Sequence, residues 1–181
     1  MNYKELRKIT PEDINENPFK LIDDDWFLLS AGSPDNFNTM TASWGGMGIL
    51  WNKNVVFCFV RPHRYTYQFM ERNEFFTMSF FNNTHRKALN ICGKVSGRNT
   101  DKMLATGLKP FASPKGSVFY EQAKLMLECK KLYYSDINPE YFLNEQIQSN
   151  YPKKDYHRMY IGEIVSCYDN AGELLGNKLL R

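Results

Sequence analysis

Residues 61–66 read RPHRYT and place two arginines, a histidine and a hydroxyl directly after an apolar stretch of chain. An arginine guanidinium binds a phosphate or carboxylate through a planar fork of N–H donors. Thr66 stands where we expect a helix to begin, so its hydroxyl and the free backbone N–H groups of the first turn are available to the same anion. The pattern indicates an anion site at the end of a strand, and a solvated loop with surface charges is the alternative.

A second segment, NTMTASW at residues 38–44, has small and hydroxyl residues where its neighbours have large apolar ones. Thr39, Thr41 and Ser43 fall on one side of an extended chain. A strand of small residues lets its backbone N–H and C=O groups approach a flat heterocycle. The composition favours a ligand against this strand, and a plain barrel strand with a polar outer face remains open.

A third segment, CGKVSGRNTDK at residues 92–102, brings two glycines, Ser96, Arg98 and Lys102 into one loop. Taken alone, this loop is a weak signal.

The sequence has no motif for a metal site, a dinucleotide loop, a catalytic nucleophile or a dithiol redox centre. His63 and His85 have no second histidine or cysteine at metal-ligand spacing. GGMG at residues 45–48 lacks the spacing of a dinucleotide loop and is interpreted as a bend or bulge in a strand, and no G-x-S-x-G motif marks a nucleophile. No C-x-x-C pair occurs, so we expect free thiols in a reducing compartment at Cys58, Cys92, Cys129 and Cys167.

Length and composition predict one globular domain over residues 1–181. With 43% hydrophobic and 15% aromatic residues, the chain has enough apolar side chains for a sizeable core. The net charge of +3 comes from 23 basic and 20 acidic residues scattered along the chain, so we expect no nucleic-acid partner. The N-terminus has interleaved charges, and the longest apolar run, residues 55–60, is too short to cross a bilayer. We therefore expect a cytoplasmic protein without a membrane role.

The segments that must position these residues are mostly strands. Alternating or continuous apolar runs predict strands at residues 26–29, 39–44, 48–51, 55–60, 75–81, 123–134 and 159–165. Capping residues and breakers predict helices at residues 65–72, 84–91 and 101–106, with a helix or helical turn at 10–17. Turns are expected at residues 23–25, 32–36, 52–54 and 169–173, and a polar excursion at 138–152. Short connections favour a mostly antiparallel sheet.

The order of these segments resembles that of the flavin reductase-like proteins with an FMN-binding split barrel. The resemblance extends over residues 22–169 and rests most on NTMTASW and RPHRYT, with the CGKVSGRNTDK loop and the late IGEIV strand as further matches. It implies a mainly β fold: an antiparallel split β-barrel with Greek-key character and a few short peripheral helices. It also implies a homodimer that holds FMN at the subunit interface.

The resemblance further implies which residues bind the cofactor. Residues 39–44 would run along the isoalloxazine edge, Arg61 and Arg64 with Thr66 and Ser43 would bind the phosphate and ribityl groups, and the third loop would close over FMN. His157, just before the late strand, would reach the flavin region from either subunit. The complete set of expected FMN-binding residues is Thr39, Met40, Thr41, Ala42, Ser43, Trp44, Arg61, Pro62, Arg64, Tyr65, Thr66, Cys92, Gly93, Ser96, Gly97, Arg98, Lys102 and His157.

The activity implied is that of an NAD(P)H-dependent flavin reductase, in which hydride passes from NADH or NADPH to bound or exchangeable FMN. Such chemistry needs two flat rings held in contact and requires no catalytic acid or base from the protein. A non-enzymatic FMN electron carrier of the flavoredoxin type, which exchanges electrons with a redox partner protein, is an alternative. A third is an enzyme like pyridoxamine-phosphate oxidase, which predicts a second phosphate pocket.

Overall fold

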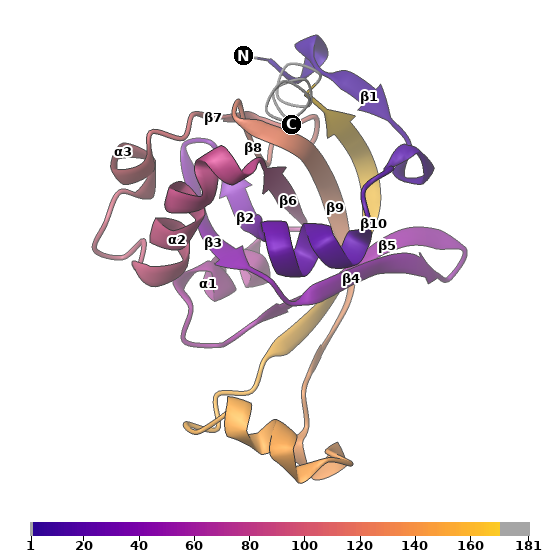
Figure 1. Ribbon diagram of the computed structural model, residues 1–181, viewed down its shortest axis with the longest axis vertical. Coiled ribbons are helices and arrows are strands. Elements are labelled where there is room, and N and C mark those ends of the chain that lie inside the picture. The colour runs from indigo at the N-terminus through magenta and orange to yellow at the C-terminus, as the bar shows by residue number, and fades with distance from the viewer. Residues whose placement is uncertain (1, 171–181) are drawn as a thin grey trace.

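The computed structural model describes residues 2–170, and its main feature is an eight-stranded antiparallel sheet curled into a barrel (Figure 1). Seven strands follow one another in the order β3–β2–β6–β9–β10–β5–β4, and β1 pairs with β10. The strands are β1 (Arg7–Ile9), β2 (Phe27–Ser33), β3 (Asn36–Ala42), β4 (Gly45–Leu50), β5 (Lys53–Val60), β6 (Phe75–Phe81), β9 (Ala123–Asp136) and β10 (Arg158–Asp169), with a separate pair of β7 (Pro110–Ala112) and β8 (Val118–Tyr120).

The barrel is split between β3 and β4, which are consecutive in sequence but stand at opposite edges of the sheet. Ser43 and Trp44 carry the chain from one edge to the other. Within residues 2–170, β3 pairs only with β2 and β4 only with β5, so each keeps a free backbone edge. The predicted antiparallel split barrel with short peripheral helices is confirmed, and its opening lies within the NTMTASW segment.

The strands fold as predicted because their side chains alternate between the two faces of the sheet. On β5, Val56, Cys58 and Val60 point into the barrel and pack against Phe76 and Met78 of β6. A second apolar cluster fills the space between the sheet, the helix that follows β6, and the β7–β8 pair. The interior of the barrel is therefore a packed core.

Three short helices cover one side of the barrel. Helix α1 (Tyr65–Arg72) has the predicted range, α2 (Arg86–Lys94) follows a 3₁₀ turn at Asn83–His85, and α3 (Lys102–Thr106) is capped by Asp101. The Asp101 side chain accepts the N–H groups of the two residues after Lys102, and Gly107 closes the helix in the left-handed conformation with φ 70°. The predicted helical turn near the N-terminus is a 3₁₀ turn at Pro11–Asp13.

The aspartate triplet at residues 23–25 differs from its prediction. We expected a solvated turn, but the triplet ends a π-helical segment, Lys20–Asp25. Leu21 and Ile22 anchor this segment in the core, and Asp25 accepts a hydrogen bond from Lys124 Nζ at 2.7 Å. The helical segment could not be predicted from the sequence, because it has only two buried apolar residues, Leu21 and Ile22. Two residues are too few to show the spacing of apolar residues that is typical of a helix.

The polar excursion between β9 and β10 forms an arm, residues 137–157, that projects away from the barrel at the bottom of Figure 1. It contains 3₁₀ turns at Pro139–Tyr141 and Glu145–Asn150. Phe142, Tyr151 and Tyr156 pack their rings together inside it, with the Tyr151 and Tyr156 ring centroids 5.0 Å apart. The arm thus has a small aromatic centre of its own.

All four cysteines are buried free thiols. Within residues 2–170 no helix has the length and hydrophobicity needed to span a membrane, and no cluster of three metal-ligating side chains occurs. The turn expected at residues 169–173 lies outside the described residues from position 171 onward.

Candidate functional site

A hollow of about 180 Å³, here called the crossing pocket, opens where the chain passes from β3 to β4. It unites three stretches that are far apart in sequence: the NTMTASW segment, the turn after β5 and the end of the arm. Its lining residues are Met40, Thr41, Ala42, Ser43, Trp44, Phe59, Arg61, Arg64 and His157.

Strand β3 presents its backbone edge to this pocket. Lys102 Nζ donates to the carbonyl oxygen of Thr39 at 2.6 Å, so the polar backbone groups of Thr39 lie on the free edge. Because these groups alternate sides along a strand, those of Thr41 point the same way. The hydroxyls are used internally: Thr39 Oγ1 accepts from Ser30, and Thr41 Oγ1 donates to the carbonyl of Leu89 in α2. The hydroxyl stripe predicted to face a ligand therefore fastens β3 to its neighbours.

A second hollow of about 220 Å³, the basic pocket, surrounds the start of α1. Arg64 lines both pockets, so its side chain stands at their boundary. The first N–H groups of α1 have no partner within the helix, and they give this end a partial positive charge. The other lining residues are Asn38, His63, Tyr65, Thr66, Gly93, Lys94, Val95, Ser96, Gly97, Arg98 and Lys102.

Arg64 is a cation of the site that has no counter-charge within residues 2–170, and unlike the exposed Lys94 it is partly withdrawn from solvent. Its guanidinium is half-buried and makes no hydrogen bond or ion pair with any residue between 2 and 170. Burial, with the positive charge of Arg61 as a smaller cause, lowers the pKa of Arg64. A partly desolvated charge that lacks a partner raises the energy of the protein, so the arrangement favours a bound anion at this position.

Two of the other basic residues of the pocket, Lys102 and Arg98, have structural partners, and Lys94 is exposed to solvent. Lys102 Nζ donates to the carbonyls of Thr39 and Cys92, and burial lowers the pKa of Lys102 to about 8. Arg98 donates to the carbonyl of His63 at 3.3 Å and lies over the ring of Tyr65, 4.8 Å from its centroid. Lys102 therefore occupies the free edge of β3 at Thr39, while Arg98 closes the outer side of the basic pocket.

Asn38 orients the hydroxyl of Thr66. The Asn38 amide donates to Thr66 Oγ1 at 2.7 Å, which leaves the hydroxyl proton of Thr66 free to be donated to a ligand. Gly97 packs directly on the same amide, since a Cβ at Gly97 would lie 2.0 Å from Asn38 Oδ1. The third loop can approach β3 this closely only with glycine at position 97.

Arg61 fastens the arm to the turn after β5. Its guanidinium donates to Asp155 at 3.0 Å and to the carbonyl of Asn150 at 2.8 Å, and it lies over the ring of Tyr151. His63 Nδ1 is also 3.0 Å from Asp155 Oδ2. Both arginines of RPHRYT therefore line the crossing pocket, but Arg61 holds the arm and Arg64 is available to a ligand.

His157 forms the arm's side of the crossing pocket. Its Nδ1 lies 2.9 Å from Tyr151 Oη, and its ring centroid is 5.1 Å from that of Trp44 and 6.3 Å from that of Phe59. Burial is the main cause that lowers the pKa of His157 to about 4, and the charge of Arg61 acts in the same direction. His157 is therefore neutral at physiological pH.

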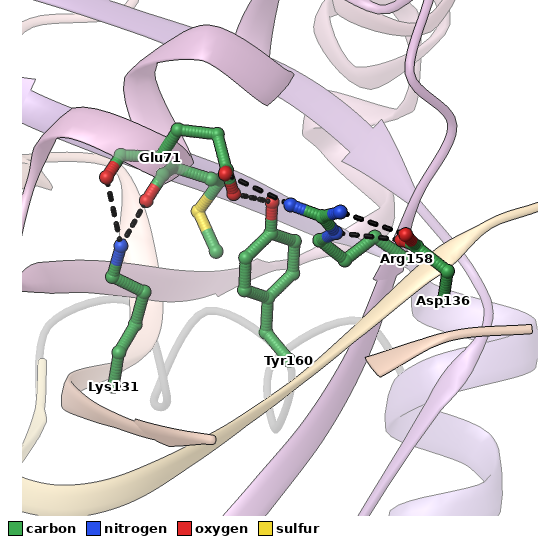
Figure 2. A network of polar contacts seen from close by, with 6 residues as sticks. Glu71, Lys131, Asp136, Arg158 and Tyr160 are labelled. Carbon is green, nitrogen blue, oxygen red and sulfur yellow. Dashed lines mark hydrogen bonds and ion pairs between the residues drawn. The ribbon is translucent and has the colours of Figure 1, made fainter. Parts of the chain in front are cut away.

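A polar network holds the far end of α1 (Figure 2). Lys131 Nζ donates to the carbonyls of Met70 and Glu71, at the end of the helix where a cation is favourable. Tyr160 Oη donates to Glu71 Oε1 at 2.6 Å, and Arg158 bridges Glu71 to Asp136 at the base of the arm. The network ties α1 to β9 and β10 and so fixes the direction in which α1 presents its first turn to the basic pocket.

Most of the site residues predicted from the sequence line one of the two pockets, and three stand back from both. Thr39 is 1% exposed and acts through its carbonyl, the Cys92 thiol is buried in the core, and Pro62 is exposed on the turn. The residues that line the two pockets are Met40, Thr41, Ala42, Ser43, Trp44, Arg61, Arg64, Tyr65, Thr66, Gly93, Ser96, Gly97, Arg98, Lys102 and His157.

The sequence reasoning missed five lining residues. Asn38 is the first residue of NTMTASW, and a search for amides beside hydroxyls would have found it. Phe59 alternates with the inward-pointing Cys58 and Val60 and so had to face outward. The others, His63, Lys94 and Val95, belong to segments that were singled out already.

These pockets are built from segments that one family shares. The family model of the flavin reductase like domain matches residues 25–179, which include both pockets. The chain belongs to the flavin reductase-like family. The resemblance inferred from NTMTASW and RPHRYT is thereby confirmed. No curated protein sequence matches this flavin reductase-like chain.

Several solved structures are similar in fold. An FMN-binding protein from Thermus thermophilus with bound 1-cyclohex-2-enone has 18% identity and a TM-score of 0.66, and the match covers 92% of this chain and 79% of that one. Flavoredoxin of Desulfovibrio vulgaris has 20% identity and a TM-score of 0.65, with 92% and 78% covered. The NADH:FAD oxidoreductase SgcE6 of Streptomyces globisporus has 14% identity and a TM-score of 0.63, with 81% and 76% covered. At these identities the likeness shows the fold of the flavin reductase-like domain.

Proposed function

We propose that this flavin reductase-like domain binds FMN across the crossing pocket and the basic pocket and catalyses hydride transfer to it from NADH or NADPH. The observation that carries the proposal is Arg64, a half-buried guanidinium without a counter-charge at the boundary of the two pockets. FMN has a flat ring at one end and a phosphate at the other, which suits a backbone-edged pocket beside a basic one.

In this proposal the two pockets have separate tasks. The free backbone edge at Thr41 and Ser43 binds the polar edge of the ring, and Trp44 with Phe59 provides apolar walls. Arg64, the hydroxyl of Thr66 and the first N–H groups of α1 bind the phosphate. The bound flavin supplies the redox chemistry, while the protein positions it and excludes water.

The residues around the crossing pocket fit a reaction that needs no acid or base from the protein. His157 lies beside the β3–β4 crossing, with its ring centroid 5.1 Å from that of Trp44, and its lowered pKa keeps it neutral. A neutral ring donates or accepts one hydrogen bond through Nε2 without adding charge beside the flavin. We assign His157 the task of orienting a ring in the pocket.

We further propose that the protein acts as a homodimer whose partner covers the outer face of β5 and β10. That face carries Phe57 and Phe59, which are only partly buried, and continues into the crossing pocket. Beside it, the half-exposed rings of Trp51 and Tyr133 lie 6.3 Å apart. Contiguous exposed apolar surface of this kind marks an interface, and the projecting arm gives a partner a second surface to contact.

Three measurements test these proposals. Protein reconstituted with excess FMN and desalted should show the flavin absorbance bands near roughly 370 and 450 nm. Colourless protein would reject the cofactor assignment.

The same protein should oxidise NADH or NADPH in steady state with added FMN. Bound flavin with negligible turnover would indicate an electron carrier of the flavoredoxin type that serves a redox partner protein. Sedimentation at low micromolar concentration should show a dimer, and a monomer would reject the shared interface.

A further inference from the structure

A larger hollow of about 510 Å³ lies next to the crossing pocket. The segment Pro18–Asp23 forms one wall and residues 43–47 form the other, and Ser43 and Trp44 line both hollows. In Figure 1 the indigo helical segment runs in front of the β3–β4 crossing, which agrees with the two segments lining one hollow. We call this space the Phe19 hollow, after the side chain at its rim.

The Phe19 hollow is apolar and has an acidic rim. Phe19 is 82% exposed and Trp44 45% exposed, although aromatic side chains of this size are normally buried. Ile22 and Met47 add aliphatic surface. Asp23 is the single charged residue of the lining, and it is exposed to solvent.

The charge of the lining limits what fits. A dinucleotide needs cations for its pyrophosphate, and the lining supplies none. An anionic ligand would also be repelled by Asp23. A neutral, flat ring compound would bury its faces against Phe19 and Trp44 at no electrostatic cost, and the volume lies in the range of small-molecule sites.

We propose that the Phe19 hollow binds a neutral, apolar ring compound as the second substrate of the domain, beside the ring bound in the crossing pocket. The proposal rests on the proposed function, because the shared residues Ser43 and Trp44 place the two ligands next to each other only if the flavin occupies the crossing pocket. In this scheme NADH or NADPH would supply one hydride to the flavin, the reduced flavin would pass it to a C=C or C=O bond of the ring compound, and a proton from solvent would complete the reduction. The hollow gives this acceptor a place separate from the basic pocket.

The first test uses FMN-loaded protein and the neutral fluorescent probe N-phenyl-1-naphthylamine. Phe19→Ala should weaken probe binding at least fivefold, whereas Leu104→Ala, which removes an equally exposed apolar side chain from α3, should leave it unchanged. Equal probe affinity in Phe19→Ala and the wild type would overturn the proposal. So would conversion of Phe19→Ala to a monomer, because the hollow would then be a subunit contact.

A second test uses the anionic probe 1-anilinonaphthalene-8-sulfonate. Asp23→Lys should raise its affinity at least fivefold, and Asp24→Lys, the same charge change on the neighbouring residue outside the lining, should not. Equal effects of both substitutions would overturn the assignment of Asp23 to the rim. Flavin content is measured on the same samples: absence of flavin from the wild type rejects the proposed function, while normal flavin with unchanged probe affinities in all variants rejects only this inference.

Discussion

Arg61 Nη1 lies 3.0 Å from Asp155 Oδ2, so the first arginine of the RPHRYT turn is held by the arm. Arg64, three residues later on the same turn, makes no such contact within residues 2–170. The two side chains look equivalent in the sequence, yet they differ in what they can bind. This difference between Arg61 and Arg64 is the basis for the predictions on Arg64→Ala and Asp155→Asn.

Arg64→Ala should weaken FMN binding roughly 10- to 100-fold, or about 1.5 to 3 kcal/mol, which is the usual range for a hydrogen bond to a charged group. The folded state should lose little, because the guanidinium has no protein partner within the described chain. Titration followed by flavin fluorescence measures the effect. Arg72→Ala serves as control, since Arg72 is exposed at the other end of α1. Equal affinities in both variants would contradict the phosphate assignment.

Asp155→Asn should loosen the arm. The substitution removes the charge that Arg61 and His63 contact, so amide hydrogens of residues 144–156 should exchange faster with solvent while those of the barrel stay protected. Hydrogen exchange read by mass spectrometry shows the difference. Glu145→Gln, an exposed carboxylate on the same arm, is the matched control. An unchanged arm in Asp155→Asn would mean that its aromatic centre alone holds it.

His157 should make stability depend on pH between about 6.5 and about 4. Its pKa in the folded protein lies below the ordinary value, so in that window the unfolded chain binds more protons and the free energy of unfolding falls as the pH falls. Chemical unfolding measured at pH 7 and pH 5 should show a smaller loss in His157→Gln than in the wild type. The same loss in His157→Gln and in the wild type would contradict burial of a neutral ring.

Tyr160→Phe should lower the free energy of unfolding by about 1 to 2 kcal/mol, because it removes a hydrogen bond to a partly solvated carboxylate. The lost bond is the one from Tyr160 Oη to Glu71 in Figure 2. Urea unfolding measures the change, and Tyr133→Phe, on the exposed end of β9, should change nothing. If the network also orients α1, FMN affinity should fall only slightly. A large loss of affinity without loss of stability would assign Tyr160 to the site itself.

Gly97→Ala should reduce FMN affinity about tenfold by pushing the third loop away from β3, an effect on the scale of a misplaced binding group. The added methyl would collide with Asn38 Oδ1, and the Asn38 amide is held by Thr66. Calorimetric titration gives the affinity. Gly48→Ala is the control, because no atom lies within 4 Å of a Cβ at that position. Retained affinity in Gly97→Ala would show that the loop can shift without cost.

Local sequence signals determined much of the fold. The apolar runs at residues 55–60 and 75–81 were enough to predict two core strands, and α1 begins and ends where its flanking residues predicted. Asp101 and Gly107 delimit α3 because capping depends on residues close in sequence. NTMTASW and RPHRYT indicated the two sides of the candidate site, since unusual composition is visible without knowledge of neighbours.

Only the tertiary structure decided what each polar side chain does there. Arg61 and Asp155 are 94 positions apart, and Lys102 and Thr39 are 63 apart, so no local pattern could assign these partners. The Thr41 hydroxyl is taken up by α2, which leaves the backbone edge to meet a ligand. A hydrogen bond or ion pair forms with whatever group packing brings within about 3 Å, and that choice depends on the whole fold.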